Sequence, residues 1–148
     1  MLDDRLRTRI EHTVDTRTAR FGAWVLRLTR GRAARLWHRR ALVLVACGRR
    51  SVRERTVPLQ YFPDGESMIV VAANSGLPAS PGWYFNLMAE PRARVDVDGR
   101  TLWVRAEQLS TPEAAESWQR VLSAAPDYAR YPRRTSRPIP LIRLTPAP

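Results

Sequence analysis

The sequence lacks lysine altogether, because all 25 of its basic residues are arginine. Without a lysine amine, Schiff-base chemistry and every other lysine-dependent mechanism are excluded. A single cysteine, Cys47, excludes an internal disulfide and fits a reducing compartment. No apolar run approaches the roughly 20 residues of a membrane-spanning helix. The N-terminus has no apolar stretch followed by a small-residue cleavage site, so a secretory signal is not expected. We therefore expect a cytoplasmic protein.

Recognisable catalytic and metal-binding patterns are also missing. No cluster of His, Cys, Asp and Glu has the spacing of metal ligands, so no metal is expected. The sequence contains no nucleophile elbow, P-loop or dinucleotide fingerprint. His12 and His38 have no acidic partner at motif spacing. If the chain is an enzyme, a bound cofactor is expected to carry the difficult chemistry while the protein orients it.

Positive charge is the strongest feature that is present, with a formal net charge of +11. Residues 1–40 hold eleven Arg against four acids, so seven of these net charges lie there. Such a balance favours anionic partners: phosphates, polycarboxylates, nucleic acid or an acidic membrane surface. Nucleic acid is not expected, because the arginines have no interleaved aromatic residues at stacking spacing.

Residues 1–40 are predicted to form a basic amphipathic helical segment, separate from a coenzyme-binding domain over residues 41–148. Phe21, Trp24, Val25 and Leu28 fall at i, i+3, i+4 and i+7, which is one helical stripe. The stripe either packs on the rest of the protein or lies on the inner face of an anionic membrane as a peripheral contact.

From residue 41 the hydrophobic period is that of β-strands. Strands are predicted over 41–46, 56–62, 67–73, 92–98, 100–108 and 139–144, with helices over 83–89 and 110–124. Asp98-Gly99 joins two alternating runs and is the strongest hairpin signal, and Ser110 opens the later helix as part of a capping box. Residues 126–137 are predicted to be irregular. About six short antiparallel strands with flanking helices indicate an α+β barrel.

The polar connection Gly48-Arg-Arg-Ser-Val-Arg-Glu-Arg55 suits an anionic cofactor. It offers four guanidiniums, a hydroxyl and turn amides, all of which bind phosphate or carboxylate oxygens. A solvated arginine turn between two strands is the alternative.

This stretch begins a series of motifs in a fixed order. Gly48-Arg-Arg-Ser51 is followed by Arg55-Thr-Val-Pro-Leu59, Ala72-Ala-Asn-Ser-Gly76, Pro81-Gly-Trp-Tyr-Phe-Asn-Leu87, Ala89-Glu-Pro91, Tyr128-Ala-Arg-Tyr131 and Arg137-Pro-Ile-Pro140. In content and order they resemble the deazaflavin-dependent nitroreductase/quinone reductase family over residues 41–146. Val52 stands where that family has glycine; because a β-branched residue is costly at positive φ, the turn here must differ.

The resemblance implies a split β-barrel and a set of site residues. The groups matching those that hold the coenzyme's anionic tail are Arg49, Arg50, Ser51 and Arg55. Those matching the backbone beside the deazaflavin ring are Pro58, Ala73, Asn74, Ser75 and Gly76, and those matching the helix that closes the pocket are Trp83 and Asn86. The substrate side is matched by Tyr61, Tyr128 and Tyr131, of which the last two are the candidate catalytic residues.

The function that the resemblance implies is hydride transfer from reduced deazaflavin, coenzyme F-420, to a small-molecule acceptor such as a quinone, nitroaromatic or enone. Two alternatives stay open at this point. The same barrel could bind FMN, FAD or a haem-type ligand, or the chain could be a noncatalytic basic protein on a membrane or nucleic acid. Related barrels commonly pair, so a homodimer is a further expectation.

Overall fold

The computed structural model describes residues 40–148. The amphipathic segment predicted within residues 1–40 lies outside the described residues apart from Arg40, as do His12 and His38. No helix in the described part of the chain is long and apolar enough to cross a membrane.

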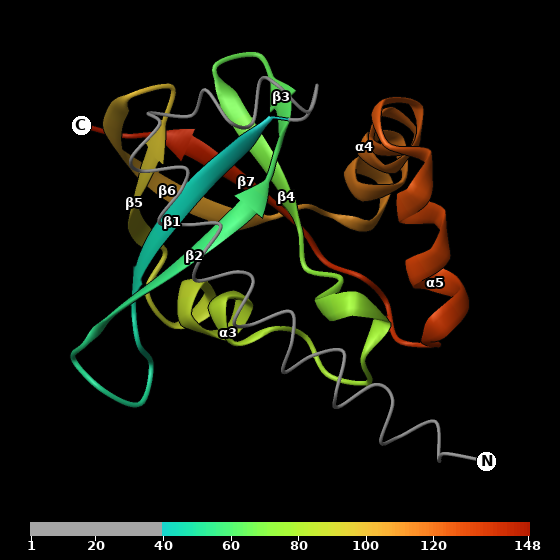
Figure 1. Cartoon of the computed structure of the whole chain (residues 1–148), viewed down its shortest axis with the longest axis horizontal. Helices are drawn as coiled ribbons and strands as arrows, with labels where there is room; N and C mark the ends of the chain where they lie inside the picture. The colour runs from blue at the N-terminus through green and yellow to red at the C-terminus, as the bar shows by residue number, and fades with distance from the viewer. Residues whose placement is uncertain (1–39) are drawn as a thin grey trace.

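Seven strands and three α-helices make up residues 40–148 (Figure 1). The strands are β1 (Ala41–Cys47), β2 (Glu54–Gln60), β3 (Phe62–Asp64), β4 (Ser67–Val71), β5 (Arg92–Val97), β6 (Arg100–Gln108) and β7 (Leu141–Pro146). The helices are α3 (Gly82–Ala89), α4 (Thr111–Ala124) and α5 (Arg130–Arg134), with single 3₁₀ turns η1 (Asn74–Gly76) and η2 (Pro126–Ala129). The α+β class and the antiparallel barrel are confirmed.

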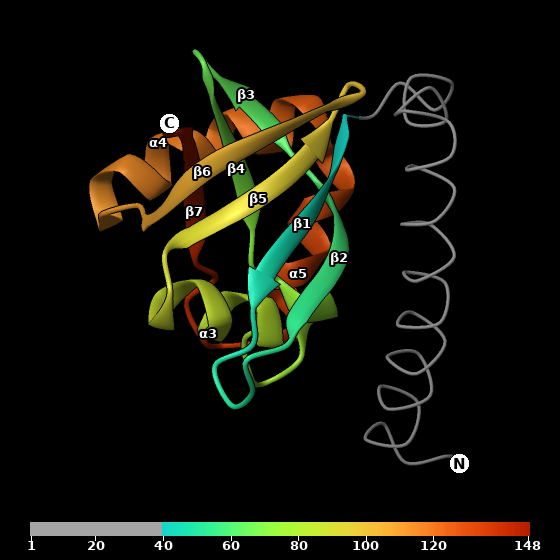
Figure 2. The same ribbon diagram turned by 90° about the vertical axis from the view of Figure 1, so that its left-hand side faces the viewer.

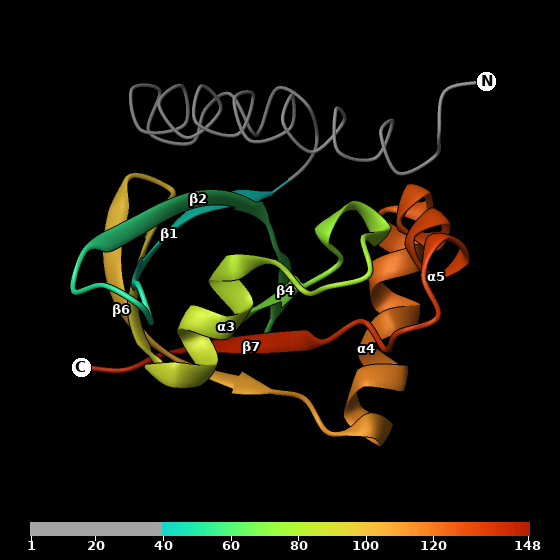
Figure 3. The same ribbon diagram turned by 90° about the horizontal axis from the view of Figure 1, so that it is seen from below.

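All seven strands belong to one antiparallel sheet in the order β2-β1-β5-β6-β7-β4-β3. The two edge strands, β2 and β3, are separated in the chain by Tyr61 alone. One residue can join opposite edges only if the sheet curls until those edges meet at that point. Away from Tyr61 the edges diverge, and the barrel is split along this line. Figure 3 shows the curled sheet from below, with α3 across its opening.

The sheet has one strand more than the six that were delimited from the sequence, since residues 56–62 are divided between β2 and β3. The division lies at Tyr61, whose backbone N–H donates to the Arg40 carbonyl at 3.0 Å. Its ring is buried in the barrel core. Periodicity could not separate the two strands because the hydrophobic pattern continues through the bend.

The β5–β6 hairpin agrees with its prediction in detail. Ala93, Val95 and Val97 are buried, while the residues between them are more exposed. Asp98 and Gly99 both have positive φ, 50° and 74°, as a two-residue hairpin turn requires. This hairpin forms the wall of the barrel opposite the split (Figure 2).

Two hydrophobic clusters lie on the two faces of the sheet. The first fills the barrel and includes Leu44, Val70, Leu87 and Ile142. The second lies between the sheet and α4 and consists of Phe62, Ile69, Leu109, Val121, Ala125 and Leu141. Leu87 brings α3 into the first cluster, so the helix that covers the barrel opening is anchored by core packing.

Residues 126–137 were predicted to be irregular, but most of them are helical. Pro126 opens η2 and α5 follows directly from it. Proline favours the first turn of a helix, and Pro126 occupies that position here, so the prediction of an irregular stretch was wrong. The last strand begins at Leu141, later than predicted, because two prolines precede it and cannot donate to the ladder.

An ion-pair network ties α4 to the sheet. Arg143 on β7 donates to Asp64 at 3.0 Å and to Glu113 at 3.1 Å, and Arg120 on α4 donates to Asp64 at 3.2 Å. The hydrogen bond from Arg143 lowers the pKa of the Asp64 carboxyl, and the Arg120 hydrogen bond lowers it further. Hydrogen bonds from Ser110 and then Arg143 lower the pKa of Glu113.

These lowered pKa values predict a loss of stability in acid. A carboxyl with a depressed folded-state pKa stabilises the protein above its unfolded pKa, and that contribution is lost as the pH falls through the folded-state pKa. The free energy of unfolding should therefore drop as the pH falls below about 4, more steeply than in an Asp64→Asn variant. The two curves should converge in strong acid, whereas Glu66→Gln in the same hairpin should follow the wild type throughout. Parallel curves for wild type and Asp64→Asn would contradict this account.

Candidate functional site

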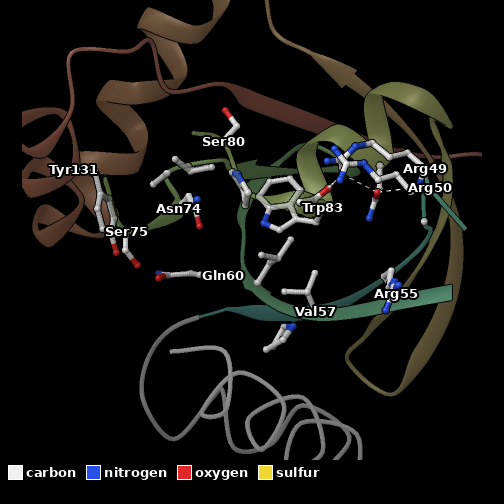
Figure 4. Close-up of a pocket in the computed structure, with 18 of the residues that line it drawn as sticks. Arg49, Arg50, Arg55, Val57, Gln60, Asn74, Ser75, Ser80, Trp83 and Tyr131 are labelled. Carbon is white, nitrogen blue, oxygen red and sulfur yellow. Dashed lines mark hydrogen bonds between the residues drawn. The ribbon is translucent and has the colours of Figure 1, made fainter. Parts of the chain in front are cut away.

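A cavity of about 830 Å³ opens at the split of the barrel, between β2, α3, η1 and α5 (Figure 4). This is the size of a pocket for a large cofactor or drug-sized ligand. The residues that line it are Gly48, Arg49, Arg50, Ser51, Arg55, Val57, Pro58, Leu59, Gln60, Val71, Ala73, Asn74, Ser75, Ser80, Pro81, Gly82, Trp83, Asn86, Tyr128 and Tyr131. Figure 4 shows Arg49, Arg50 and Arg55 on one side of Trp83, with Asn74, Ser75 and Tyr131 on the other.

The arginine-rich connection between β1 and β2 is a tight loop. The N–H of Gly48 donates to the Arg53 carbonyl at 2.9 Å, and the N–H of Ser51 donates back to the Gly48 carbonyl at 3.3 Å. A Cβ at Gly48 would lie 3.1–3.2 Å from atoms of Ser51 and Arg53. Glycine at this position therefore allows the loop to close on itself.

Helix α3 holds one end of this loop. The side-chain oxygen of Asn86, which is buried, accepts hydrogen bonds from the backbone N–H of Arg49 at 3.0 Å and from its guanidinium at 3.4 Å. The same guanidinium lies 4.9 Å from the centre of the Phe85 ring and donates to the Gly82 carbonyl. Asn86 thus fixes the position of the loop, and Arg49 is partly committed to the protein.

Arg50 and Arg55 differ from Arg49 in being uncommitted. Neither guanidinium forms a hydrogen bond or ion pair with any residue between 40 and 148, and both line the cavity. Val52, at the tip of the loop, is 97% exposed, and its φ is not positive. The predicted difference from a glycine-containing turn is therefore accommodated without strain.

The far side of the cavity is formed by a strained turn at the end of β4. Asn74, Ser75 and Gly76 have consecutive positive φ values of 47°, 55° and 76°. Asn74 stabilises its own conformation by donating through its side chain to the Ala79 carbonyl at 2.9 Å. Ala73, Asn74 and Ser75 line the cavity, whereas Gly76 is buried behind them. Backbone strain of this kind collects at ligand sites.

Arg137 holds this turn against the C-terminal segment. Its guanidinium donates to the carbonyls of Ala72, Ala73 and Leu77, at 3.3, 2.8 and 2.9 Å, and to the Ser80 hydroxyl at 3.3 Å. Burial lowers the pKa of this guanidinium. Only arginine carries donors in a planar fork that can reach so many acceptors at once. The arginine of the Arg-Pro-Ile-Pro motif is therefore explained by its hydrogen bonds to the turn that forms the cavity wall.

Trp83, Pro58 and Val57 supply apolar surface between the two ends of the cavity. Trp83 also packs against the barrel core, so its ring contributes to both core and pocket. Tyr128 and Tyr131 lie at the end opposite the arginines, and their rings meet edge to face with centroids 5.2 Å apart. One helical turn at Pro126 brings them onto one face.

Two of the predicted site residues do not line the cavity. Tyr61 was expected on the substrate side, but the structure buries it in the barrel core at the joint between β2 and β3. Gly76 was expected beside the ring, and it instead supports the turn from behind: a Cβ there would lie 2.5 Å from the Cβ of Arg134. The other twelve predicted residues all line the cavity.

Sequence reasoning missed several lining residues, of which Gln60 and Leu59 on β2 matter most. Arg55, Val57 and Leu59 alternate along one strand, so a prediction that placed Arg55 in the site could have included the other two. No sequence signal pointed to Gln60. Its place in the site follows from the bend at Tyr61.

The fold is shared with several solved structures. One described as "Structure of F-420-H2 Dependent Reductase (FDR-A)" is 31% identical and superposes with a TM-score of 0.65, covering 72% of this chain and 94% of that one. A second, described as a domain-swapped dimer, is 27% identical with a TM-score of 0.66, covering 79% and 96%. A FAD-binding protein of Mesorhizobium loti, 18% identical with a TM-score of 0.52 over 76% and 83%, shares the fold alone.

Fold and cavity together define a split-barrel coenzyme-binding protein of the flavin-reductase type. The family model for F-420H(2)-dependent quinone reductase matches residues 18–146. A relative with this name in Mycobacterium tuberculosis strain H37Rv, Rv1261c, is 39% identical over 124 residues, which cover 78% of this chain and 83% of that protein. The chain belongs to the F-420H(2)-dependent quinone reductase family.

Proposed function

We propose that this chain transfers a hydride from reduced coenzyme F-420 to a quinone within the cavity at the barrel split. The observation that carries the proposal is the polarity of that cavity. Uncommitted guanidiniums lie at one end, apolar side chains line the middle, and Tyr131 lies at the other end with the Tyr128 ring against it. This order suits a ligand with an anionic tail, a flat ring and a reacting partner beyond the ring.

The residues of the cavity fit the coenzyme. Arg50 and Arg55 would hold its anionic tail by charge-assisted hydrogen bonds, with Ser51 and the loop amides beside them. Arg49 would contribute less, because Asn86, Phe85 and Gly82 already engage its guanidinium.

The ring would lie where the cavity is apolar and its backbone rigid. Trp83 and Pro58 would border it on one side and the turn of Ala73, Asn74 and Ser75 on the other. Arg137 would keep that turn in place.

The chemistry assigns few tasks to the protein. When bound, the reduced coenzyme supplies a hydride and a proton, which together convert a quinone to a quinol. The chain's own residues then need only bind, orient and exclude water. Tyr128 and Tyr131 would orient the acceptor, and no metal-ligand cluster occurs among residues 40–148. A nitroaromatic or enone acceptor would need the same orientation and stays a prediction.

Two further properties are inferred. The likeness to a structure described as a domain-swapped dimer supports a homodimer. Peripheral contact of residues 1–40 with an anionic membrane rests on their charge and apolar stripe alone.

A binding screen tests the choice of coenzyme. The full-length protein should bind F-420 in a titration followed by tryptophan fluorescence, because Trp83 lines the cavity. FMN, FAD and haem should bind at least about tenfold more weakly than F-420. Each of them differs from F-420 in the anionic tail or in the shape of the ring. Tighter binding of FMN or FAD would move the protein to the alternative class of flavin binder.

A further inference from the structure

The two tyrosines of the cavity differ in their hydrogen bonds. The hydroxyl of Tyr128 donates to the side-chain oxygen of Gln60 at 3.1 Å. The hydroxyl of Tyr131 instead accepts a hydrogen bond, from the guanidinium of Arg130 at 3.1 Å. A phenol has one proton and two acceptor positions, so these contacts leave the two hydroxyls with different capacities toward a ligand.

Tyr128 is held on both its ring and its hydroxyl. Its ring meets Phe62 edge to face, with centroids 5.4 Å apart, and packs against the cluster between the sheet and α4. Its proton is directed to Gln60, which is fixed by the bend of the chain after β2. Tyr128 is therefore placed to shape the cavity more than to donate a proton to its contents.

The hydroxyl proton of Tyr131 is available to a ligand in the cavity. Its hydroxyl forms no hydrogen bond with residues 40–148 other than the one it accepts from Arg130. The Arg130 guanidinium also lies 5.0 Å from the centre of the Tyr131 ring. The hydrogen bond from Arg130 occupies one acceptor position of the phenol oxygen, and a hydroxyl that accepts a hydrogen bond is polarised toward donating its own proton.

We propose that Tyr131 is the residue that donates a hydrogen bond to the acceptor's carbonyl oxygen, and that Arg130 and Gln60 are positioning residues that set the two tyrosine hydroxyls in opposite roles. The inference rests on the proposed function, because it assigns the carbonyl acceptor to the tyrosine end of the same cavity.

Infrared spectroscopy of a bound quinone tests this assignment without turnover. The probe is 2-methyl-1,4-naphthoquinone labelled with ¹³C at its carbonyls, bound to the full-length protein together with oxidised F-420. A donated hydrogen bond lowers the carbonyl stretching frequency, so the wild type should show a down-shifted band. Tyr131→Phe should lose this band and Tyr128→Phe should keep it. The control is Tyr84→Phe, because Tyr84 bonds Gln108 outside the cavity lining.

Single-turnover rates should follow the same order. Tyr131→Phe should slow quinone reduction by roughly 10²-fold or more, as removal of a positioned donor does. Tyr128→Phe should cost less than about tenfold, and Tyr84→Phe should match the wild type. Thermal unfolding of each variant reports whether a loss reflects misfolding.

Variants of Arg130 and Gln60 distinguish the effect of their hydrogen bonds to the tyrosines from the effect of their packing. Arg130→Met should weaken the shifted band, and Arg130→Lys should restore part of it because an ammonium also donates. Gln60→Met should release the Tyr128 proton and broaden the band, whereas Gln60→Glu, which still accepts, should leave the band in place.

The outcomes distinguish this inference from the function on which it rests. A wild-type protein that does not oxidise reduced F-420 with a quinone refutes the proposed function and the inference together. A wild type that turns over while Tyr131→Phe keeps the shifted band, or while Tyr128→Phe alone loses it, overturns the inference and leaves the function standing.

Discussion

Replacing Arg50 and Arg55 together with alanine is expected to weaken F-420 binding by about 10²-fold or more. A hydrogen bond to a charged group contributes about 1.5–3 kcal/mol, and about 1.4 kcal/mol is a factor of ten in affinity. Both guanidiniums line the cavity, and neither is paired with another described residue, so each is available to the coenzyme tail. Affinity should be measured by titration at two salt concentrations, and salt should weaken the wild type more than the variant.

A charge-matched control isolates the site from the overall charge. Arg53 lies in the same loop and Arg105 on β6, and neither lines the cavity. The double alanine variant of Arg53 and Arg105 removes the same two charges and should change affinity by less than about threefold, because an exposed guanidinium without a direct contact to the ligand contributes little. Equal losses in the two double variants would show that net charge, and not the site, attracts the coenzyme.

Gly76→Ala is expected to lower the free energy of unfolding by about 2–4 kcal/mol. Two costs combine at this position. Its φ of 76° disfavours a side chain, and the new Cβ would lie 2.5 Å from the Cβ of Arg134. The strain would also move the turn that lines the cavity, so F-420 affinity should fall with stability. Denaturant titrations at constant slope give the stability change.

Two other glycines serve as matched controls. Gly65 has a similar φ of 60°, but a Cβ there would meet no atom within 4 Å, so Gly65→Ala reports the cost of the backbone conformation alone, about 1–2 kcal/mol. Gly82 has neither problem, and Gly82→Ala should be nearly neutral. If Gly76→Ala is no worse than Gly65→Ala, the contact with Arg134 does not constrain the turn.

Much of the barrel could be predicted because its strands are specified locally. The alternation of Ala93, Val95 and Val97 and the Asp98-Gly99 turn indicate the β5–β6 hairpin from the local sequence alone. The split depends instead on the meeting of two edge strands at Tyr61, which is a long-range property of the whole sheet. The hydrophobic period of the sequence does not reveal where the two edge strands meet.

The candidate site also combines features that the local sequence indicates with features that depend on long-range contacts. The arginine loop could be singled out because its guanidiniums and turn amides suit an anionic ligand, and the structure places Arg49, Arg50 and Arg55 along the cavity. The role of Asn86 in fixing the Arg49 backbone depends on a contact across 37 positions of sequence. Tyr61, which the resemblance assigned to the substrate side, is instead buried in the barrel core, and no local sequence feature distinguishes these two positions.

The roles proposed for Gln60 and Arg130 depend on contacts that form only in the folded chain. Each is an ordinary polar residue in the sequence, and each contacts one tyrosine hydroxyl in the structure. The direction of those hydrogen bonds gives two similar tyrosines different capacities. No composition or spacing argument could have separated them.

The most direct test of the central claim is anaerobic mixing of the full-length protein with reduced F-420 and 2-methyl-1,4-naphthoquinone. We expect protein-dependent oxidation of the coenzyme with one quinol formed per coenzyme oxidised. Deuterium at the donating carbon of the coenzyme should slow the step, since a hydride is transferred there. Binding of reduced F-420 without its oxidation by the quinone, or turnover supported by reduced FMN in its place, would contradict the account.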